Sequence, residues 1–318
     1  MRIELEKSKD ELLETVLEIQ TGITNKNHLS NRELIEICKN NKINCVTNIE
    51  NQRIHDLLET AVNIHLFEKY KLKSNLNAYE ILADLEELAS KLPTQSWRDY
   101  EQTEFQQFST PPALAFVMFQ LLKPTENTVA LEPSAGTGCL ANWLKIGGCK
   151  VEVNEISNRR RHLLEIQNYN PHNLNAEFID DLLDEEIKPN FILMNPPFSS
   201  NGGRTKKNSN FGFRHVESSL RRLNMGGRLV CLLGKETCLN TIKGRYFWNQ
   251  IQIEYKIRAF LKVPSKAFYK HGTTFETVII IIDKLPQNKI ENSQNEQKPQ
   301  LLEFCSLAEI LQFSESLN

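Results

Sequence analysis

The stretch "TVALEPSAGTGCLANWL", residues 128–144, decides the fold. An apolar run ends at Glu132 and is followed by a turn with Gly136 and Gly138, after which apolar residues recur at helical spacing. Glycine allows the backbone to turn sharply and to approach a ligand closely. This segment therefore predicts a strand, a ligand-binding turn and a helix, in that order.

The chain beyond this stretch continues to alternate between strands and helices. Apolar runs predict six further strands, at residues 150–156, 176–180, 191–195, 227–233, 258–263 and 275–283. Helical spacing predicts helices near residues 139–147, 158–169 and 213–224. Such alternation indicates an α/β fold, in which a mostly parallel seven-stranded sheet is flanked by helices on both faces. In sheets of this kind, ligands bind at the carboxyl ends of the strands.

The remainder of the chain divides into two flanking parts. Residues 1–100 carry helical spacing, and Ser30 with Glu33 fits a capping box, so we expect an all-α N-terminal domain there. The alternating part spans residues 104–286. Residues 287–318 predict a polar linker followed by a short C-terminal helix.

The composition excludes several classes of protein. No apolar run reaches the roughly 18 residues of a membrane-spanning helix, and the N-terminal "MRIELEKSKD" has no apolar signal-peptide core. The seven cysteines include no C-x-x-C pair, and His215 and His271 lack metal-ligand spacing. We therefore expect a cytoplasmic protein with no membrane partner and no metal site, in which these histidines are structural.

Acidic residues close three of the expected strands: Glu132, Glu155 and Asp181. Glu155 follows Gly136 by nineteen residues, where a carboxylate can accept both hydrogen bonds of a ribose diol. Either Asp180 or Asp181 could face inward, near the place of an adenine amino group. Two alternatives stay open: the glycine spacing through Ala141 also fits a dinucleotide fingerprint, and chance can place acids at strand ends.

A second motif, "NPPF" at residues 195–198, ends another apolar run. The two prolines lock φ and remove backbone N–H groups, so the Asn195 side-chain oxygen and the Pro196 carbonyl form two fixed acceptors. Two such acceptors can hold both N–H bonds of a planar amine, and Phe198 can stack on the ring that carries it. The alternative is a simple turn that ends the strand.

Glu132, "PSAGTG" at residues 133–138, Glu155, Asp181 and "NPPF" together resemble the class I S-adenosylmethionine-dependent methyltransferases, and more narrowly the DNA adenine-N6 enzymes. "QFSTPP" at residues 107–112, ahead of the glycine loop, is similar to their γ-type motif order. Residues 203–230 resemble methylase modules found with strawberry-notch-type helicases on plasmids and phages. The resemblance covers residues 104–284 and implies a Rossmann-like fold, S-adenosylmethionine as cofactor and DNA methylation, as in restriction-modification.

The same resemblance implies roles for individual residues. Glu132 would bind the methionine ammonium of the cofactor, Thr110 its carboxylate, Glu155 its ribose and Asp181 its adenine amine. The cofactor loop would comprise Pro133, Ser134, Ala135, Gly136 and Gly138, and the catalytic clamp would comprise Asn195, Pro196, Pro197 and Phe198. An anionic Glu132 suits an ammonium and not a phosphate, which counts against a nicotinamide dinucleotide.

The clamp does not fix the amine. Glutamine methyltransferases of the release-factor type use a near-identical motif, usually ending in Tyr, and an RNA adenine methyltransferase is a further alternative. A catalytically inactive, cofactor-binding assembly subunit is the alternative of another class. Phe198 and the early "QFSTPP" favour DNA. Only 34 residues follow Lys284, where many DNA methyltransferases carry a target-recognition domain. Three alternatives stay open: sequence choice rests on loops and the N-terminal helices, specificity is low, or a helicase or specificity partner supplies it. The oligomeric state stays open.

Residues 199–270 contain fifteen Lys and Arg and three acids, a net charge of +12 in a chain of net charge −2. Such a segment is typical of a polyanion-binding surface. We expect phosphate contacts from Arg204, Lys206, Lys207 and Arg214, with Phe211 and Phe213 stacking on bases. The alternative is a solvated surface whose charges pair locally.

If this segment contacts phosphates, DNA affinity should fall steeply with salt, because bound counterions are released. Reversing the charge of Lys206 and Lys207 should flatten the slope of log affinity against log salt concentration. The same reversal at Lys39 and Lys42, outside the segment, should leave the slope unchanged. Titration of labelled DNA at several salt concentrations measures it, and a flat slope for the unmodified protein would leave the segment an ordinary surface.

Overall fold

The computed structural model describes residues 9–25, 28–45, 48–72, 77–94, 109–197, 211–239, 241–271, 276–286 and 299–317. Four of the expected site residues, Phe198, Arg204, Lys206 and Lys207, lie outside these ranges, and so does the Phe211 side chain. Their roles stay predictions.

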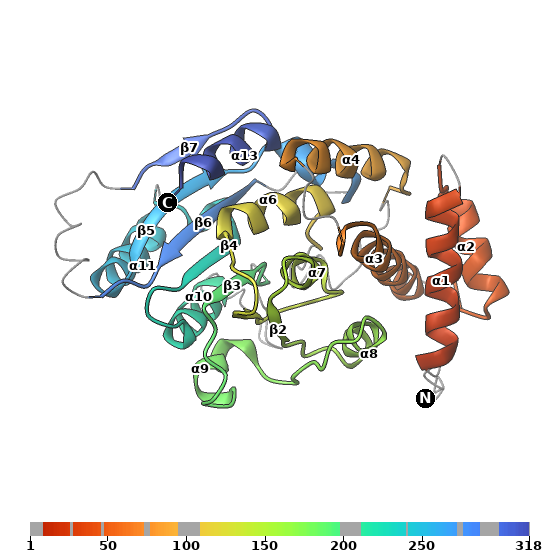
Figure 1. Cartoon of the computed structure of the whole chain (residues 1–318), viewed down its shortest axis with the longest axis horizontal. Coiled ribbons are helices and arrows are strands. Elements are labelled where there is room, and N and C mark those ends of the chain that lie inside the picture. Colours follow the sequence, from red (N-terminus) through yellow and green to blue (C-terminus); the bar gives the residue numbers. More distant parts are fainter. Residues whose placement is uncertain are drawn as a thin grey trace.

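A seven-stranded sheet forms the centre of the protein (Figure 1). Its strands are β1 Val129–Glu132, β2 Lys150–Val153, β3 Phe191–Met194, β4 Arg228–Gly234, β5 Lys256–Lys262, β6 Thr277–Asp283 and β7 Leu301–Glu303. The spatial order is β2-β1-β3-β4-β6-β5-β7, with β6 antiparallel to both neighbours and the other pairs parallel. This confirms the expected α/β fold with a mostly parallel, seven-stranded sheet.

The strand expected at residues 176–180 is wrong. Ala176–Phe178 form the 3₁₀ turn η1 and Ile179–Leu182 the short helix α9. Ala176, Ile179 and Leu183 are buried while Phe178 and Leu182 are half exposed, so burial follows a helical period and not the alternation of a strand. The count of seven is reached by β7, which pairs with β5 in the segment expected to be linker and helix.

Helices cover both faces of the sheet (Figure 1). One face packs against α6 Pro112–Leu122, α7 Cys139–Ile146 and α13 Leu307–Ser316, and the other against α10 Phe211–Arg222 and α11 Ile242–Glu254. Alternate residues along β4 belong to the two cores, Val230 and Leu232 to the first and Cys231 and Leu233 to the second. Helix α8, Asn158–Ile166, follows β2. Two short 3₁₀ segments, η2 Lys235–Thr237 and η3 Ser265–His271, follow β4 and β5.

The N-terminal region is helical, as expected. It consists of α1 Lys9–Asn25, α2 Asn31–Asn40, α3 Asn48–Tyr70 and α4 Ala78–Lys91. The capping box is confirmed: Glu33 N donates to Ser30 Oγ at 3.2 Å, and Ser30 N donates to Glu33 Oε2 at 2.9 Å.

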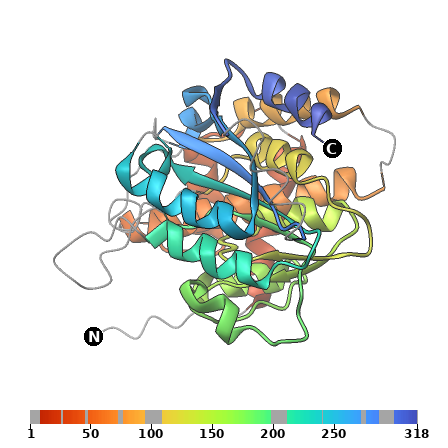
Figure 2. The same cartoon turned by 90° about the vertical axis from the view of Figure 1, so that its left-hand side faces the viewer.

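These N-terminal helices share a core with the rest of the protein. Their buried apolar residues belong to the same cluster as those of α6, α7 and one face of the sheet. Helix α3 packs on α7 and α8, while α4 packs on α6 and on α13 from the other end of the chain (Figure 2). The division into domains near residue 100 stays a prediction.

Within the described ranges, no helix has both the length and the hydropathy that crossing a membrane requires.

A buried charge cluster joins the central strands of the sheet. Arg228 of β4 donates from Nε and Nη2 to both Asp283 carboxylate oxygens, at 2.7 and 3.1 Å, and Arg258 Nε donates to the same carboxylate at 2.6 Å. Asp283 is 5% exposed, and it lies in register with Arg228 across the β4–β6 pair. One carboxylate thus pairs with guanidinium groups from two strands.

Asp283→Ala should lower the free energy of unfolding by about 3–5 kcal/mol, because it removes the carboxylate that pairs with the buried Arg228 guanidinium. Urea denaturation followed by circular dichroism measures this. Glu303→Ala is the control, since the Lys262–Glu303 pair is exposed and should contribute about 0–1 kcal/mol. Equal effects of the two substitutions would contradict a central role for the Asp283 cluster.

Candidate active site

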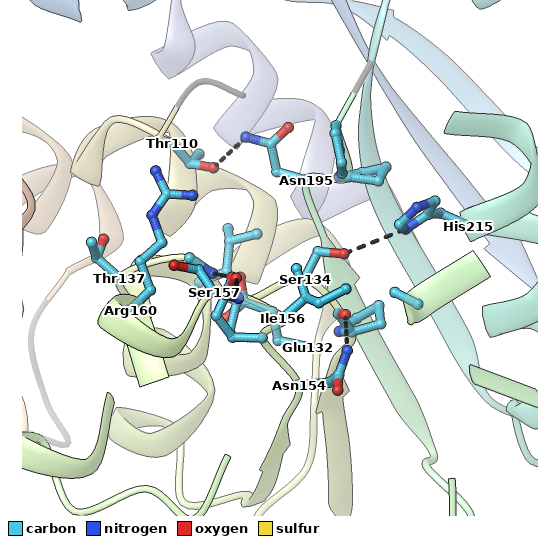
Figure 3. Close-up of a pocket in the computed structure, with 18 of the residues that line it drawn as sticks. Thr110, Glu132, Ser134, Thr137, Asn154, Ile156, Ser157, Arg160, Asn195 and His215 are labelled. Atoms are coloured by element: carbon cyan, nitrogen blue, oxygen red, sulfur yellow. Dashed lines mark hydrogen bonds between the residues drawn. The ribbon is translucent and has the colours of Figure 1, made fainter. Parts of the chain in front are cut away.

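A cavity of about 340 Å³ lies at the carboxyl ends of β1, β2 and β3 (Figure 3). It brings together most of the expected site residues: Thr110, Glu132, Pro133, Ser134, Ala135, Gly136, Glu155, Asn195, Pro196 and Pro197. The further lining residues are Ser109, Thr137, Cys139, Leu140, Asn154, Ile156, Ser157, Arg160, Leu174, Asn175, Ala176 and His215. Two motifs that are about sixty residues apart in the sequence therefore line one cavity.

The glycine loop forms one wall of this cavity. Gly136 and Gly138 have φ values of +56° and +90°, which L side chains rarely adopt. A side chain at Gly138 would also meet Leu164 Cδ2 at 2.8 Å. Gly138 does not itself line the cavity, so its contribution is to shape the loop.

The two strand-end carboxylates are held by backbone amides. Glu132 is 2% exposed and accepts a hydrogen bond from Ala141 N at 2.6 Å. Glu155 accepts one from Gly136 N at 2.8 Å and one from Ser157 N at 2.7 Å. Neither carboxylate has a Lys, Arg or His partner among the described residues, which suits a ligand that brings a positive charge or hydroxyl groups.

Burial strongly affects the ionisation of Glu132. Desolvation raises the pKa of this carboxyl well above its usual range, the Ala141 hydrogen bond opposes the rise, and the charge of Glu155 adds to it. A cationic ligand group beside Glu132 would stabilise the charged form.

The Asn195 side chain is oriented across the cavity by Thr110. Asn195 Nδ2 donates to Thr110 Oγ1 at 3.0 Å, which fixes Nδ2 on the Thr110 side and turns Oδ1 the other way (Figure 3). This bond joins residues that are 85 positions apart and links the loop before α6 to the end of β3. Sequence patterns gave no indication of it.

His215 also lines the cavity, although the sequence indicated only a structural role. Its Nδ1 lies 3.4 Å from Ser134 Oγ, and the residue is 4% exposed. Burial lowers the pKa of the imidazole to about 4, so the ring is neutral at pH 7. Its position depends on how α10 packs on the sheet, and no residue spacing in the sequence predicts this packing.

Asn154 is another residue that sequence reasoning missed. Its Nδ2 donates to the carbonyl oxygens of Pro133 and Leu174 at 2.9 and 3.0 Å, and its Oδ1 accepts from Leu174 N at 2.8 Å. This side chain thereby ties the loop after β1 to the segment that precedes η1. The sequence predicted a strand at residues 150–156 with Glu155 near its end, but nothing in the pattern indicated a role for Asn154.

Asp181 does not reach the cavity, so the expected adenine contact is wrong for this residue. It is exposed on α9, because the segment forms a helix where a strand was expected. Asp180 faces α10, where it accepts from Ser218 Oγ at 2.6 Å and from Arg221 at 3.0 Å. Asn175 and Ala176 line the cavity in that region.

The basic segment is partly neutralised in the structure. Among the described residues, six of its cations pair with carboxylates: Arg214, Arg221, Arg228, Lys235, Arg258 and Lys262. Arg214 is exposed, with its Nη1 3.3 Å from Glu177 Oε1. Phe213 is buried and stacks on Phe247 at 4.3 Å, so the expected stacking of Phe213 on a base is wrong. Local pairing therefore accounts for much of the charge excess.

No group of three or more His, Cys, Asp or Glu side chains in the described ranges is arranged to hold a metal ion.

Residues 114–256 match the family model of the methyltransferase small domain. Among curated proteins, none matches the sequence. The fold is similar to that of the type I restriction-modification methyltransferase subunit from Streptococcus thermophilus, with a TM-score of 0.50 and 15% identity over 90% of this chain and 62% of that chain.

Two further solved structures match less closely. The EcoKI M protein, from a type I restriction enzyme, has a TM-score of 0.44 and 15% identity over 86% of this chain and 67% of that one. TrmN from Thermus thermophilus has a TM-score of 0.42 and 17% identity. The match covers 55% of this chain and 49% of TrmN, so this chain spans about half the length of TrmN. At 15% identity, the match to the Streptococcus thermophilus subunit shows a shared fold alone.

The sheet and its flanking helices form a Rossmann-like class I methyltransferase fold. The match to the methyltransferase small domain agrees with this fold and supports methyl transfer as the activity. Fold and family match together imply that the cofactor is S-adenosylmethionine.

Proposed function

We propose that this protein transfers a methyl group from S-adenosylmethionine to the N6 amine of adenine in DNA, with the base turned out of the duplex into the "NPPF" clamp. The observation that carries the proposal is the single cavity that contains both strand-end carboxylates and the clamp residues Asn195 and Pro196. The carboxylates suit the cofactor, and the clamp suits an amine.

The cavity residues fit S-adenosylmethionine by their chemistry. The Glu155 carboxylate would accept hydrogen bonds from the ribose hydroxyls, and the buried Glu132 carboxylate would accept the methionine ammonium. Ile156, which is 64% exposed and lines the cavity, offers an apolar surface for the adenine ring. The bound cofactor supplies an electrophilic methyl group on a sulfonium ion.

The clamp residues would prepare the substrate amine. The lone pair of adenine N6 is delocalised into the ring, so both N–H bonds must be held for the lone pair to point at the methyl group. Asn195 Oδ1 and the Pro196 carbonyl oxygen are two neutral acceptors for this purpose, and the hydrogen bond to Thr110 preorganises the Asn195 amide. Because Asn is uncharged, no carboxylate needs to be desolvated beside the base.

The choice of DNA depends on the motif order, on Phe198 and on Arg204, Lys206 and Lys207. All four residues lie outside the described ranges. We propose that Phe198 stacks on the extruded base and that the three cations contact phosphates. A helicase or a specificity subunit would supply target selection. A protein glutamine amide fits the same pair of acceptors, so product analysis decides between the two substrates.

Glu155→Ala should weaken the binding of S-adenosylhomocysteine about 10- to 100-fold, because hydrogen bonds to a charged group are lost. Glu152→Ala is the matched control: it removes a β2 carboxylate that pairs with His172 and does not line the cavity. Isothermal calorimetry measures both affinities. Equal affinities for Glu155→Ala and the unmodified protein would contradict the ribose assignment.

Asn195→Ala should lower turnover about 10²- to 10³-fold, because it removes one preorganised acceptor of the reacting amine. The affinity for S-adenosylhomocysteine should change little. Mass analysis of nucleosides released from DNA measures the rate of N6-methyladenine formation. Asn173→Ala, at an exposed residue outside the cavity, is the control. N6-methyladenine made at the normal rate by Asn195→Ala would contradict the clamp mechanism.

A further inference from the structure

Arg160 is one of the cavity-lining residues that contact the N-terminal helices. It lies in α8, its side chain is 11% exposed, and its Nε is 3.7 Å from Asp56 Oδ2 of α3. Asp56 is itself 3% exposed and also pairs with Arg159. A buried carboxylate from an N-terminal helix therefore lies beside a cationic side chain of the cavity wall.

The same helix holds two other parts of the wall. Glu59 Oε2 accepts hydrogen bonds from Ser109 Oγ and from Thr137 Oγ1, both at 2.8 Å. Asn63 Nδ2 donates to the Thr137 carbonyl at 2.9 Å. Asp56, Glu59 and Asn63 are spaced three and four residues apart, so they lie on one face of α3. This face contacts α8, the residue before Thr110 and the glycine loop.

The charge of this cluster favours an anionic ligand group. Burial first and Asp56 second raise the pKa of Glu59, while the hydrogen bonds from Ser109 and Thr137 and the charge of Arg160 oppose the rise. Burial therefore disfavours the Glu59 anion, and both arginines lie within ion-pair distance of Asp56. Of these two arginines, Arg160 lines the cavity and Arg159 does not.

The Arg160 guanidinium points toward the side of the cavity where Thr110 and Thr137 are drawn, and His215 lies on the opposite side (Figure 3). The cavity thus has carboxylates at the ends of β1 and β2 and a guanidinium with a hydroxyl group at its Thr110 side. S-adenosylmethionine has matching chemistry, since only its amino-acid part carries a carboxylate, and this carboxylate is attached to the same carbon as the ammonium.

We propose that Arg160, positioned by Asp56 of α3, binds the carboxylate of the methionine part of S-adenosylmethionine together with Thr110. Helix α3 is then part of the cofactor site, which gives the N-terminal helices a role in binding. This inference rests on the proposed cofactor site and is independent of the DNA substrate.

The test compares two ligands that differ in one group. S-adenosylhomocysteine carries the carboxylate, and its decarboxylated analogue, an aminopropylthio-adenosine, keeps the ammonium and lacks the carboxylate. Calorimetry on the full chain should show that the unmodified protein binds the first ligand more tightly. Arg160→Met should lose about 10- to 100-fold in affinity for S-adenosylhomocysteine and little for the analogue.

Three further variants separate a binding role from a structural one. Arg159→Met is the matched control, because it removes the neighbouring arginine that shares Asp56 but does not line the cavity; its affinities should match the unmodified protein. Arg160→Lys should restore part of the preference, since a charge remains without the planar guanidinium. Asp56→Asn should reduce the preference without abolishing the binding of the analogue.

Two results would overturn the inference. One is an Arg160→Met protein that keeps the full preference for the carboxylate ligand. The other is an equal loss of affinity for both ligands in Arg160→Met and in Arg160→Lys, while the unfolding transitions of both variants stay unchanged. This result would mean that Arg160 contacts the adenosine part of the ligand. Failure of the unmodified protein to bind either ligand would instead contradict the cofactor site itself.

Discussion

Parallel pairing of β2, β1 and β3 is the constraint on which the site depends. Glu132 pairs with Val153 across β1 and β2, and Leu131 pairs with Ile192 across β1 and β3. In this register the last residues of the three strands lie nearly level, so the residues that follow them enter one cavity. In the proposed function, Glu132 and Glu155 would bind the cofactor and Asn195 would bind the substrate amine. A shift of one residue in either pair would turn a carboxylate or the amide away.

Two contacts from distant parts of the chain complete the site. The Asn195–Thr110 hydrogen bond makes the orientation of the Asn195 side chain depend on the loop before α6. In the proposed function, this bond would link a cofactor-binding residue with a substrate-binding one. Helix α3 contacts the glycine loop through Asn63 and Glu59. The N-terminal helices therefore contact the glycine loop through hydrogen bonds, in addition to sharing an apolar core with α6 and α7.

Much of the central fold could be predicted because its signals are local. The strand, glycine turn and helix at residues 128–144 and the Ser30–Glu33 capping box depend on neighbouring residues. Long-range packing explains what could not be predicted. The helix at Ile179–Leu182 resembles a short strand in its apolar content, and β7 is too short to show a pattern. His215 and Arg160 reach the cavity only because α10 and α8 pack as they do. Phe213 was expected at a nucleic-acid surface, but α11 covers it.

The central claim is that the amine held by the clamp is adenine N6 in DNA. The most direct measurement uses S-adenosylmethionine with a deuterated methyl group, incubated with the protein and with DNA, RNA or protein extract. Nucleosides and peptides are then analysed by mass spectrometry. The account predicts deuterated N6-methyladenine in DNA. Deuterated methylglutamine in a protein, or N6-methyladenine in RNA alone, would contradict it.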